Sequence, residues 1–271
     1  MARKSYPTDL TDMEWEILAP LIPPAKEGGH PRTTDMREVC NAIYYHLKTG
    51  CQWNMLPGDF PLSSTVYNYY RKWQRKGIWE KLNHSLRGQV RLKLGKSTQP
   101  SALAKLAVGI AADSQSVKTD PKKGDVYGFD GGKKVKGRKR QTLVDSLGLL
   151  LKVVVSEANA PERLVAAYAL MELLEERPEL LEKVEVLWVD SGYDGDKFAL
   201  CVWLMIQAHV EVIRRTKPEF QVLPKRWVVE RTFGWFNQYH RLSKDYERLP
   251  EMSEAAIYAV MTRIMLRRLV A

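Results

Sequence analysis

Three acidic residues stand where predicted secondary structure would hold them fixed. The apolar run Val184 to Val189 predicts a strand buried on both faces, and it stops at Asp190 beside a glycine turn. A second apolar strand, Ala107 to Thr119, carries Asp113. Glu230 lies on a helical pattern between residues 223 and 247. Because ligands in open α/β sheets collect at the carboxyl ends of strands, Asp190 is a candidate for a functional site.

A simpler interpretation of Asp190 stays open at this point. An Asp before Ser-Gly often caps a turn, so the residue alone does not identify a site.

The segment around Glu230 predicts one long helix, Lys225 to Lys244. At 100° per residue, one narrow stripe of this helix is polar, and the opposite side is apolar and would face the core. The stripe holds Arg226, Glu230, Asn237, Arg241 and Lys244, and the apolar side holds Val228, Trp235, Tyr239 and Leu242. The helix would therefore present a carboxylate flanked by cations.

The spacing of these acids and three longer motifs resemble a known family. Asp113 and Asp190 lie 77 residues apart, and Glu230 follows 40 residues later, as in the Asp-Asp-Glu triad of DDE transposases. The motifs are GFDGGKKVKGRKRQTLVDSLGLLL, WVDSGYDG and WVVERTFGWFNQYHRLSKDYER. Together they look like the insertion-sequence-five family of bacterial transposases, within the insertion-sequence-four group. Tyr6 to Trp79 also looks like the amino-terminal domain of that family.

The resemblance implies a fold, an activity and a cofactor. The expected fold is an α/β catalytic core of RNase H-like type, a mixed sheet with flanking helices, preceded by a small all-α domain of helix-turn-helix type. Asp113, Asp190 and Glu230 would be both the catalytic residues and the ligands of two Mg²⁺ ions, with Mn²⁺ as a substitute. Asp113 would bridge the two ions. Arg226 would hold a phosphate near the scissile group.

The sequence departs from the wider group at two signature positions. That group carries Tyr, Arg, Glu and Lys around its glutamate; Arg226 and Glu230 match, whereas Leu223 and Asn237 replace Tyr and Lys. Arg241 and Lys244, on the same predicted stripe, are candidates to replace the missing lysine.

Composition favours a polyanionic partner. The 271 residues contain 42 Lys and Arg against 32 Asp and Glu, a net charge of +10. The longest apolar run is too short to span a bilayer, and no signal-peptide core follows the amino terminus. The three cysteines lack metal-binding spacing and are expected to be reduced thiols in a cytoplasmic protein. We expect double-stranded DNA as partner, no membrane, and a homodimer or higher oligomer on paired ends.

Residues 1–95 predict a helical domain that binds DNA ends. Capping residues at Thr11 and Asp35 begin the first two helices, and a third helix runs from Ser63 or Ser64 to Lys76. Its polar face is basic and suggests a helix that contacts DNA, whereas the alternative is a solvated face in a small bundle. The candidate DNA-binding residues on this face are Asn68, Arg71, Lys72 and Arg75, next to Lys76.

After a linker at residues 96–104, residues 105–271 would form the catalytic domain. A Gly-rich loop, residues 121–140, carries six cations that would repel one another without an anion nearby, so we expect DNA phosphate there rather than a merely flexible, solvated loop. These cations are Lys133, Lys134, Lys136, Arg138, Lys139 and Arg140. Asp145 resembles a fourth ligand, but it lies at a predicted hairpin turn about residues 146–148 that explains it.

The function predicted from the sequence is a transposase that acts on the terminal inverted repeats of its own element by metal-dependent strand cleavage and strand transfer. One rival is a metal-dependent nuclease of the same fold without strand transfer. The other is a domesticated DNA-binding protein without catalysis.

Overall fold

The computed structural model describes residues 3–25, 28, 31–100, 108–120, 124–214 and 224–271. Residues 101–104 of the expected linker, residues 121–123 of the cationic loop and Leu223 of the signature lie outside these ranges.

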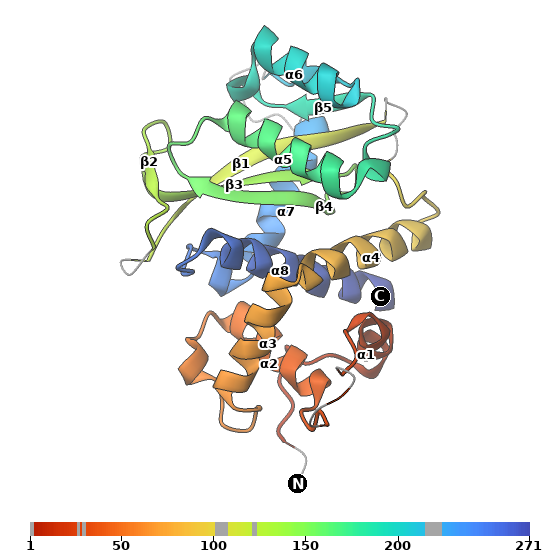
Figure 1. The fold of residues 1–271 in the computed structure, drawn as a ribbon, viewed down its shortest axis with the longest axis vertical. Coiled ribbons are helices and arrows are strands. Elements are labelled where there is room, and N and C mark those ends of the chain that lie inside the picture. The colour runs from red at the N-terminus through yellow and green to blue at the C-terminus, as the bar shows by residue number, and fades with distance from the viewer. Residues whose placement is uncertain (1–2, 26–27, 29–30, 101–107, 121–123, 215–223) are drawn as a thin grey trace.

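The amino-terminal region is helical, as expected (Figure 1). Helix α1 (Asp12–Leu18) begins with the predicted capping box, in which the Glu14 amide donates to Thr11 Oγ1 at 3.2 Å and the Thr11 amide donates to Glu14 Oε2 at 2.8 Å. Asp35 caps α2 (Met36–Thr49), and Gly50 ends that helix with a left-handed φ of 73°. Helices α3 (Ser63–Arg75) and α4 (Ile78–Lys93) follow.

The second half of the chain contains a six-stranded mixed sheet. Strand β3 (Val135–Val144) pairs antiparallel with β1 (Gly109–Lys118), with β4 (Leu150–Glu157) and with the short β2 (Gly128–Asp130). On its other side β1 pairs in parallel with β5 (Val186–Val189), which pairs in parallel with β6 (His209–Val212). This mixed sheet confirms the expected fold class.

Helices cover both faces of the sheet, and each face has its own core. Helices α5 (Glu162–Glu176) and α6 (Asp196–Ile206) cover one face, where Ile110, Ala112 and Leu187 are buried. Helices α7 (Pro224–Asn237) and α8 (Pro250–Val270) cover the other, where Ala111 and Trp188 are buried. The alternation of neighbouring residues between faces is the period of two that a strand imposes.

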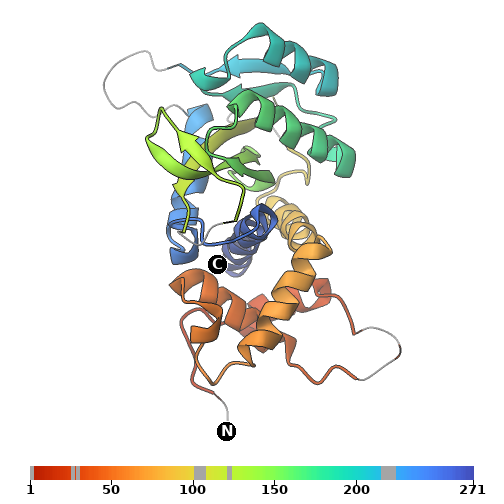
Figure 2. The ribbon, with the colours of Figure 1, turned by 60° about the vertical axis from the view of Figure 1, so that its left-hand side comes forward.

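Helix α8 joins the helical region to the sheet. In Figures 1 and 2, α8 and α4 lie between the sheet and helices α1 to α3. Buried residues of α2, α3 and α4 belong to the same hydrophobic core as those of α7, α8 and the α7-facing side of the sheet. A buried ion pair between Arg263 of α8 and Glu14 of α1 adds a polar contact. The two regions therefore share one core.

Two elements differ from the sequence-based expectation. β2 was not predicted, because its three residues lie within a stretch whose glycines indicate a loop. The Glu230 helix was predicted to reach Lys244, but α7 ends at Asn237 and a short 3₁₀ turn, His240–Leu242, follows. Tyr239, just before this turn, and Leu242, within it, are still buried; these two residues extended the apolar pattern.

No helix in the described ranges is long and apolar enough to cross a bilayer. Cys40, Cys51 and Cys201 are free thiols.

Candidate active site

Strand register places the two aspartates side by side. Ala111 of β1 pairs with Trp188 of β5, so two residues further along each strand Asp113 stands beside Asp190. Their side chains lie on the α7 side of the sheet, because residues two apart in a strand share a face. Since β5 ends at Val189, Asp190 lies at its carboxyl end, and its side chain accepts a hydrogen bond from the Gly192 amide at 2.8 Å. The turn-capping role considered from the sequence is thus present as well.

Helix α7 brings the third acid and a cation to the same place. Arg226 Nε lies 2.9 Å from Glu230 Oε1, and Arg226 Nη2 lies 3.8 Å from Asp190 Oδ2. One guanidinium therefore bridges acids from the helix and the strand. Glu230 itself stays exposed.

Asp113 is buried within the sheet, with 9% of its surface exposed. Burial and the negative charge of Asp190 raise the pKa of Asp113 to about 7. Its main-chain oxygen accepts hydrogen bonds from Gln141 and Thr142 of β3, which fix this part of β1.

A fourth carboxylate, Glu162, lies at the same edge and was missed from the sequence. It is the first residue of α5, and its Oε1 accepts a hydrogen bond from Ser114 Oγ at 2.7 Å. Glu162 and Asp190 both approach Gly192: a Cβ added to that glycine would lie 2.7 Å from Glu162 Oε2 and 3.1 Å from Asp190 Oδ1. Burial acts to raise the pKa of Glu162, but the hydrogen bond from Ser114 and the charges of Lys139 and Lys133 hold this pKa below its ordinary value. The sequence signal was only that Glu162 follows Pro161, a residue common at helix starts.

The donor set suits a divalent metal, although the acids are not gathered into a complete cage. Mg²⁺ prefers carboxylate oxygen, and the negative charge of Asp190 that raises the pKa of Asp113 also favours a bound cation. Among the described residues no three His, Cys, Asp or Glu side chains are grouped closely enough to hold an ion. Arg226 is paired with Glu230 at the place where the third ligand would act.

Half of the predicted cationic loop is structural. Arg138, Lys139 and Arg140 belong to β3 and are buried, so the prediction that they contact DNA was wrong. Arg138 donates to the carbonyls of residues 247 and 248, and Arg140 to those of residues 242 and 244. Lys139 donates to the Ala160 carbonyl at 3.2 Å. These side chains satisfy backbone oxygens that the interior would otherwise leave unpaired.

The other half of the loop stays exposed. Lys133, Lys134 and Lys136 lie at or beside the β2–β3 turn, and their contact with DNA stays a prediction.

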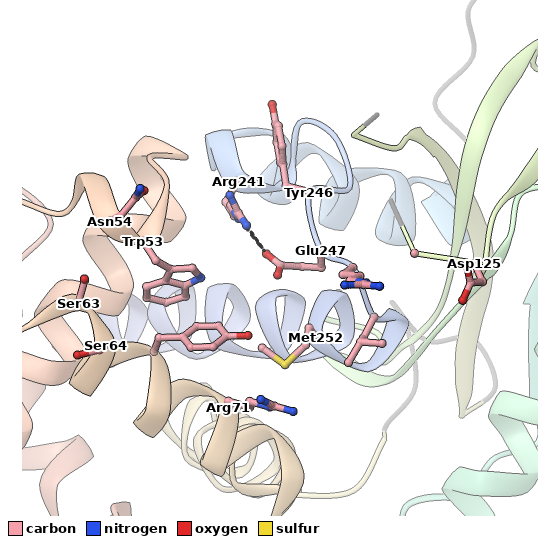
Figure 3. Close-up of a pocket in the computed structure, with 14 residues that line it drawn as sticks. Trp53, Asn54, Ser63, Ser64, Arg71, Asp125, Arg241, Tyr246, Glu247 and Met252 are labelled. Atoms are coloured by element: carbon pink, nitrogen blue, oxygen red, sulfur yellow. Dashed lines mark hydrogen bonds and ion pairs between the residues drawn. The ribbon is translucent and has the colours of Figure 1, made fainter. Parts of the chain in front are cut away.

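The expected stripe beyond Asn237 does not form. Because α7 ends there, Arg241 lies outside the helix, and its side chain is only 10% exposed and bonded to Glu247 at 2.7 Å (Figure 3). This pair lines a pocket of about 840 Å³ between α3 and the segment before α8. Lys244 is exposed, but it lies beyond the 3₁₀ turn. The prediction that Arg241 and Lys244 share one helical stripe with Glu230 was therefore wrong.

The basic face of α3 is present as expected. Arg71, Lys72 and Arg75 are exposed, and with Asn68 and Lys76 they line one shallow hollow. Val66, Tyr70 and Trp73 are buried on the opposite side. Contact of this face with DNA stays a prediction.

Two family models match opposite ends of the chain. The model described as "Putative transposase of IS4/5 family" matches residues 10–83, and the model described as "Transposase DDE domain" matches residues 187–267. The second range includes Asp190 and Glu230, while Asp113 lies outside both.

Two curated proteins of Burkholderia cepacia are similar. The "Insertion element IS402 uncharacterized 16.2 kDa protein" is 30% identical over 88 residues, which are 30% of this chain and 60% of that protein. The "Putative transposase for insertion sequence element IS402" is 26% identical over 126 residues, 44% of this chain and 58% of that protein. The chain thus spans about three-fifths of the length of each relative. The two family models and these relatives agree: the parts of the chain that they match are similar to transposases, those of the IS4/5 family and of IS402 among them.

Proposed function

We propose that this protein is a transposase that binds the terminal inverted repeats of its element, cuts DNA at the carboxyl end of β5 and joins the freed end to a target. The observation that supports the proposal is that the strand register brings Asp113 beside Asp190, while Arg226 of α7 lies against both Asp190 and Glu230.

Asp113, Asp190 and Glu230 are the residues that would hold two Mg²⁺ ions, with Mn²⁺ as a substitute. When bound, such ions activate the attacking oxygen and stabilise the leaving oxygen of an in-line displacement at phosphorus. Arg226 would turn from the acids to a phosphate oxygen, because guanidinium binds phosphate with matched geometry. Asp113, fixed by β3, would keep its carboxylate in place.

DNA recognition is assigned to the basic face of α3. The helix exposes its cations and is held by buried aromatic side chains, so a rigid face would meet the duplex. Because α3 shares a core with the sheet, end binding would place the DNA in a fixed relation to the acids.

The test uses Asp113→Asn, Asp190→Asn and Glu230→Gln in the full chain with a duplex that carries an element end. We expect each variant to lose Mg²⁺-dependent cleavage while end binding survives. Asp196→Asn, an exposed acid at the start of α6, is the matched control and should cleave like the parent. Substantial cleavage by Asp190→Asn would refute the site.

Product analysis separates the rivals. Joined products in which the element end is covalently linked to target DNA support a transposase. Cut DNA ends without any joined product would indicate a nuclease. Specific binding without cutting would indicate a DNA-binding protein.

A further inference from the structure

The β2–β3 turn brings one lysine to the acidic edge of the sheet. Lys133 Nζ donates to the main-chain oxygen of Ser114 at 3.2 Å, and Ser114 is the residue after Asp113. The same ammonium lies 3.6 Å from Glu162 Oε1. Nearly half of the Lys133 side chain, 47%, remains exposed. A cation is thus held beside the candidate active site and stays open to a ligand.

The turn that carries Lys133 is fixed by Asp130. Asp130 Oδ1 accepts from the amides of Gly132 at 3.1 Å and Lys133 at 3.0 Å. Asp130 Oδ2 accepts from Ser116 Oγ of β1 at 2.5 Å. The hairpin is therefore tied to the strand that carries Asp113, and a group fixed before the reaction loses little freedom during it.

The cations of the predicted stripe and the other lysine beside Glu162 are engaged or placed elsewhere. Arg241 is paired with Glu247, and Lys139 is buried between Glu162 and the Ala160 carbonyl. Asn237, at the signature position itself, accepts a hydrogen bond from Gln115 at 3.5 Å.

We propose that Lys133 supplies the cation that the signature places at residue 237, and that Glu162 positions it against the phosphate being cut. This inference rests on the proposed function. In the free protein the ammonium is held by Ser114 and Glu162; with DNA bound, a non-bridging phosphate oxygen becomes an additional partner. A lysine suits this role because its ammonium is a compact point charge that stabilises negative charge as it develops.

The first experiment compares Lys133→Ala and Lys133→Arg in the full chain. Single-turnover cleavage of a duplex element end with Mg²⁺ is measured beside end affinity from fluorescence anisotropy. We expect Lys133→Ala to slow cleavage by about 10² while affinity falls by about threefold or less, because the contact acts mainly on developing charge. Lys133→Arg should recover most of the rate.

The matched control is Lys183→Ala. Lys183 is an exposed lysine before the amino end of β5, at the opposite end of that strand from Asp190. This variant should cleave at the parental rate. If Lys133→Ala and Lys183→Ala behave alike, Lys133 contributes only general charge and the proposal fails.

A double-mutant cycle tests the part played by Glu162. Glu162→Gln should slow cleavage less than Lys133→Ala, and it should add nothing in the double variant if it acts through the lysine. If the fold-reductions in cleavage rate of the two single variants multiply in the double variant, Glu162 does not act through Lys133 and that role is overturned. If the parent chain cuts DNA and Lys133→Ala cuts it equally fast, this inference alone is refuted. If the parent chain does not cut DNA at all, the proposed function and this inference are refuted together.

Discussion

A buried charge cluster joins α4 to the sheet and gives a sharp prediction about stability. Asp145, at the turn between β3 and β4, accepts from Arg91 at 2.7 Å and from Arg87 at 3.2 Å through the same oxygen. The exposed fractions of the three side chains are 0–2%. The other oxygen of Asp145 accepts from the amides of Leu147 and Leu149.

Asp145→Asn isolates the charge, because an amide oxygen can still accept from the two turn amides. It would leave two buried guanidinium groups without their counter-ion. Removing one partner of a buried pair costs about 3–5 kcal/mol, a large fraction of an ordinary stability of about 5–15 kcal/mol. With about 2–4 °C per kcal/mol for domains of this size class, we expect the melting temperature to fall by about 10 °C.

The assay is urea denaturation and thermal melting at pH 7, with Asp194→Asn as control. Asp194 is also paired with an arginine, Arg214, but these side chains are 51% and 67% exposed. An exposed pair contributes less than about 1 kcal/mol, so this control should melt close to the parent. If Asp145→Asn lies within about 1 kcal/mol of the parent, the cluster does not hold α4 to the sheet and the reasoning is refuted.

Three further predictions follow from other contacts. Replacing both Arg71 and Lys72 with Ala should reduce the log-log salt slope of end binding by about 1.8 if each contacts a phosphate, and an unchanged slope would exclude such contacts. Burial lowers the pKa of His46 to about 3, so as pH falls below about 6.5 this histidine takes up a proton in the unfolded chain but not in the folded one. The free energy of unfolding should therefore drop by about 2 kcal/mol from pH 7 to pH 5. His46→Phe should remove this part of the pH dependence. Arg226→Ala should tighten Mn²⁺ binding to the DNA-free protein by about tenfold in calorimetry, whereas Lys225→Ala, whose partner is Glu211, should not.

Local signals in the sequence predicted most elements. Thr11 and Asp35 cap helices because their side chains satisfy amides that a helix start leaves unpaired, a requirement that depends on few neighbours. The apolar run before Asp190 formed β5 for a similarly local reason. The position of Asp113 beside Asp190 needed the strand register, which the sequence alone did not provide.

The errors arose where distant segments decide. The apolar pattern of α7 continued to Leu242 because both Tyr239 and Leu242 are buried. The chain nevertheless leaves the helix after Asn237 and turns toward α2, where Lys48 donates a hydrogen bond to the Gln238 carbonyl. Glu162 was missed because its relation to the site depends on contacts with β1 and with the β2–β3 turn.

Where the cations lie changes what the net charge of +10 implies. In the described ranges seven Lys and Arg side chains are buried, more than the four buried Asp and Glu. Several neutralise or satisfy interior groups, as Arg91 does for Asp145 and Arg138 for Asp245. Such cations release no counterions when DNA binds, so they cannot add to the salt dependence of binding. Among the exposed cations, we expect those on α3 and at the β2–β3 turn to contact phosphate, so the salt slope of end binding should report these two places rather than the charge of the whole chain.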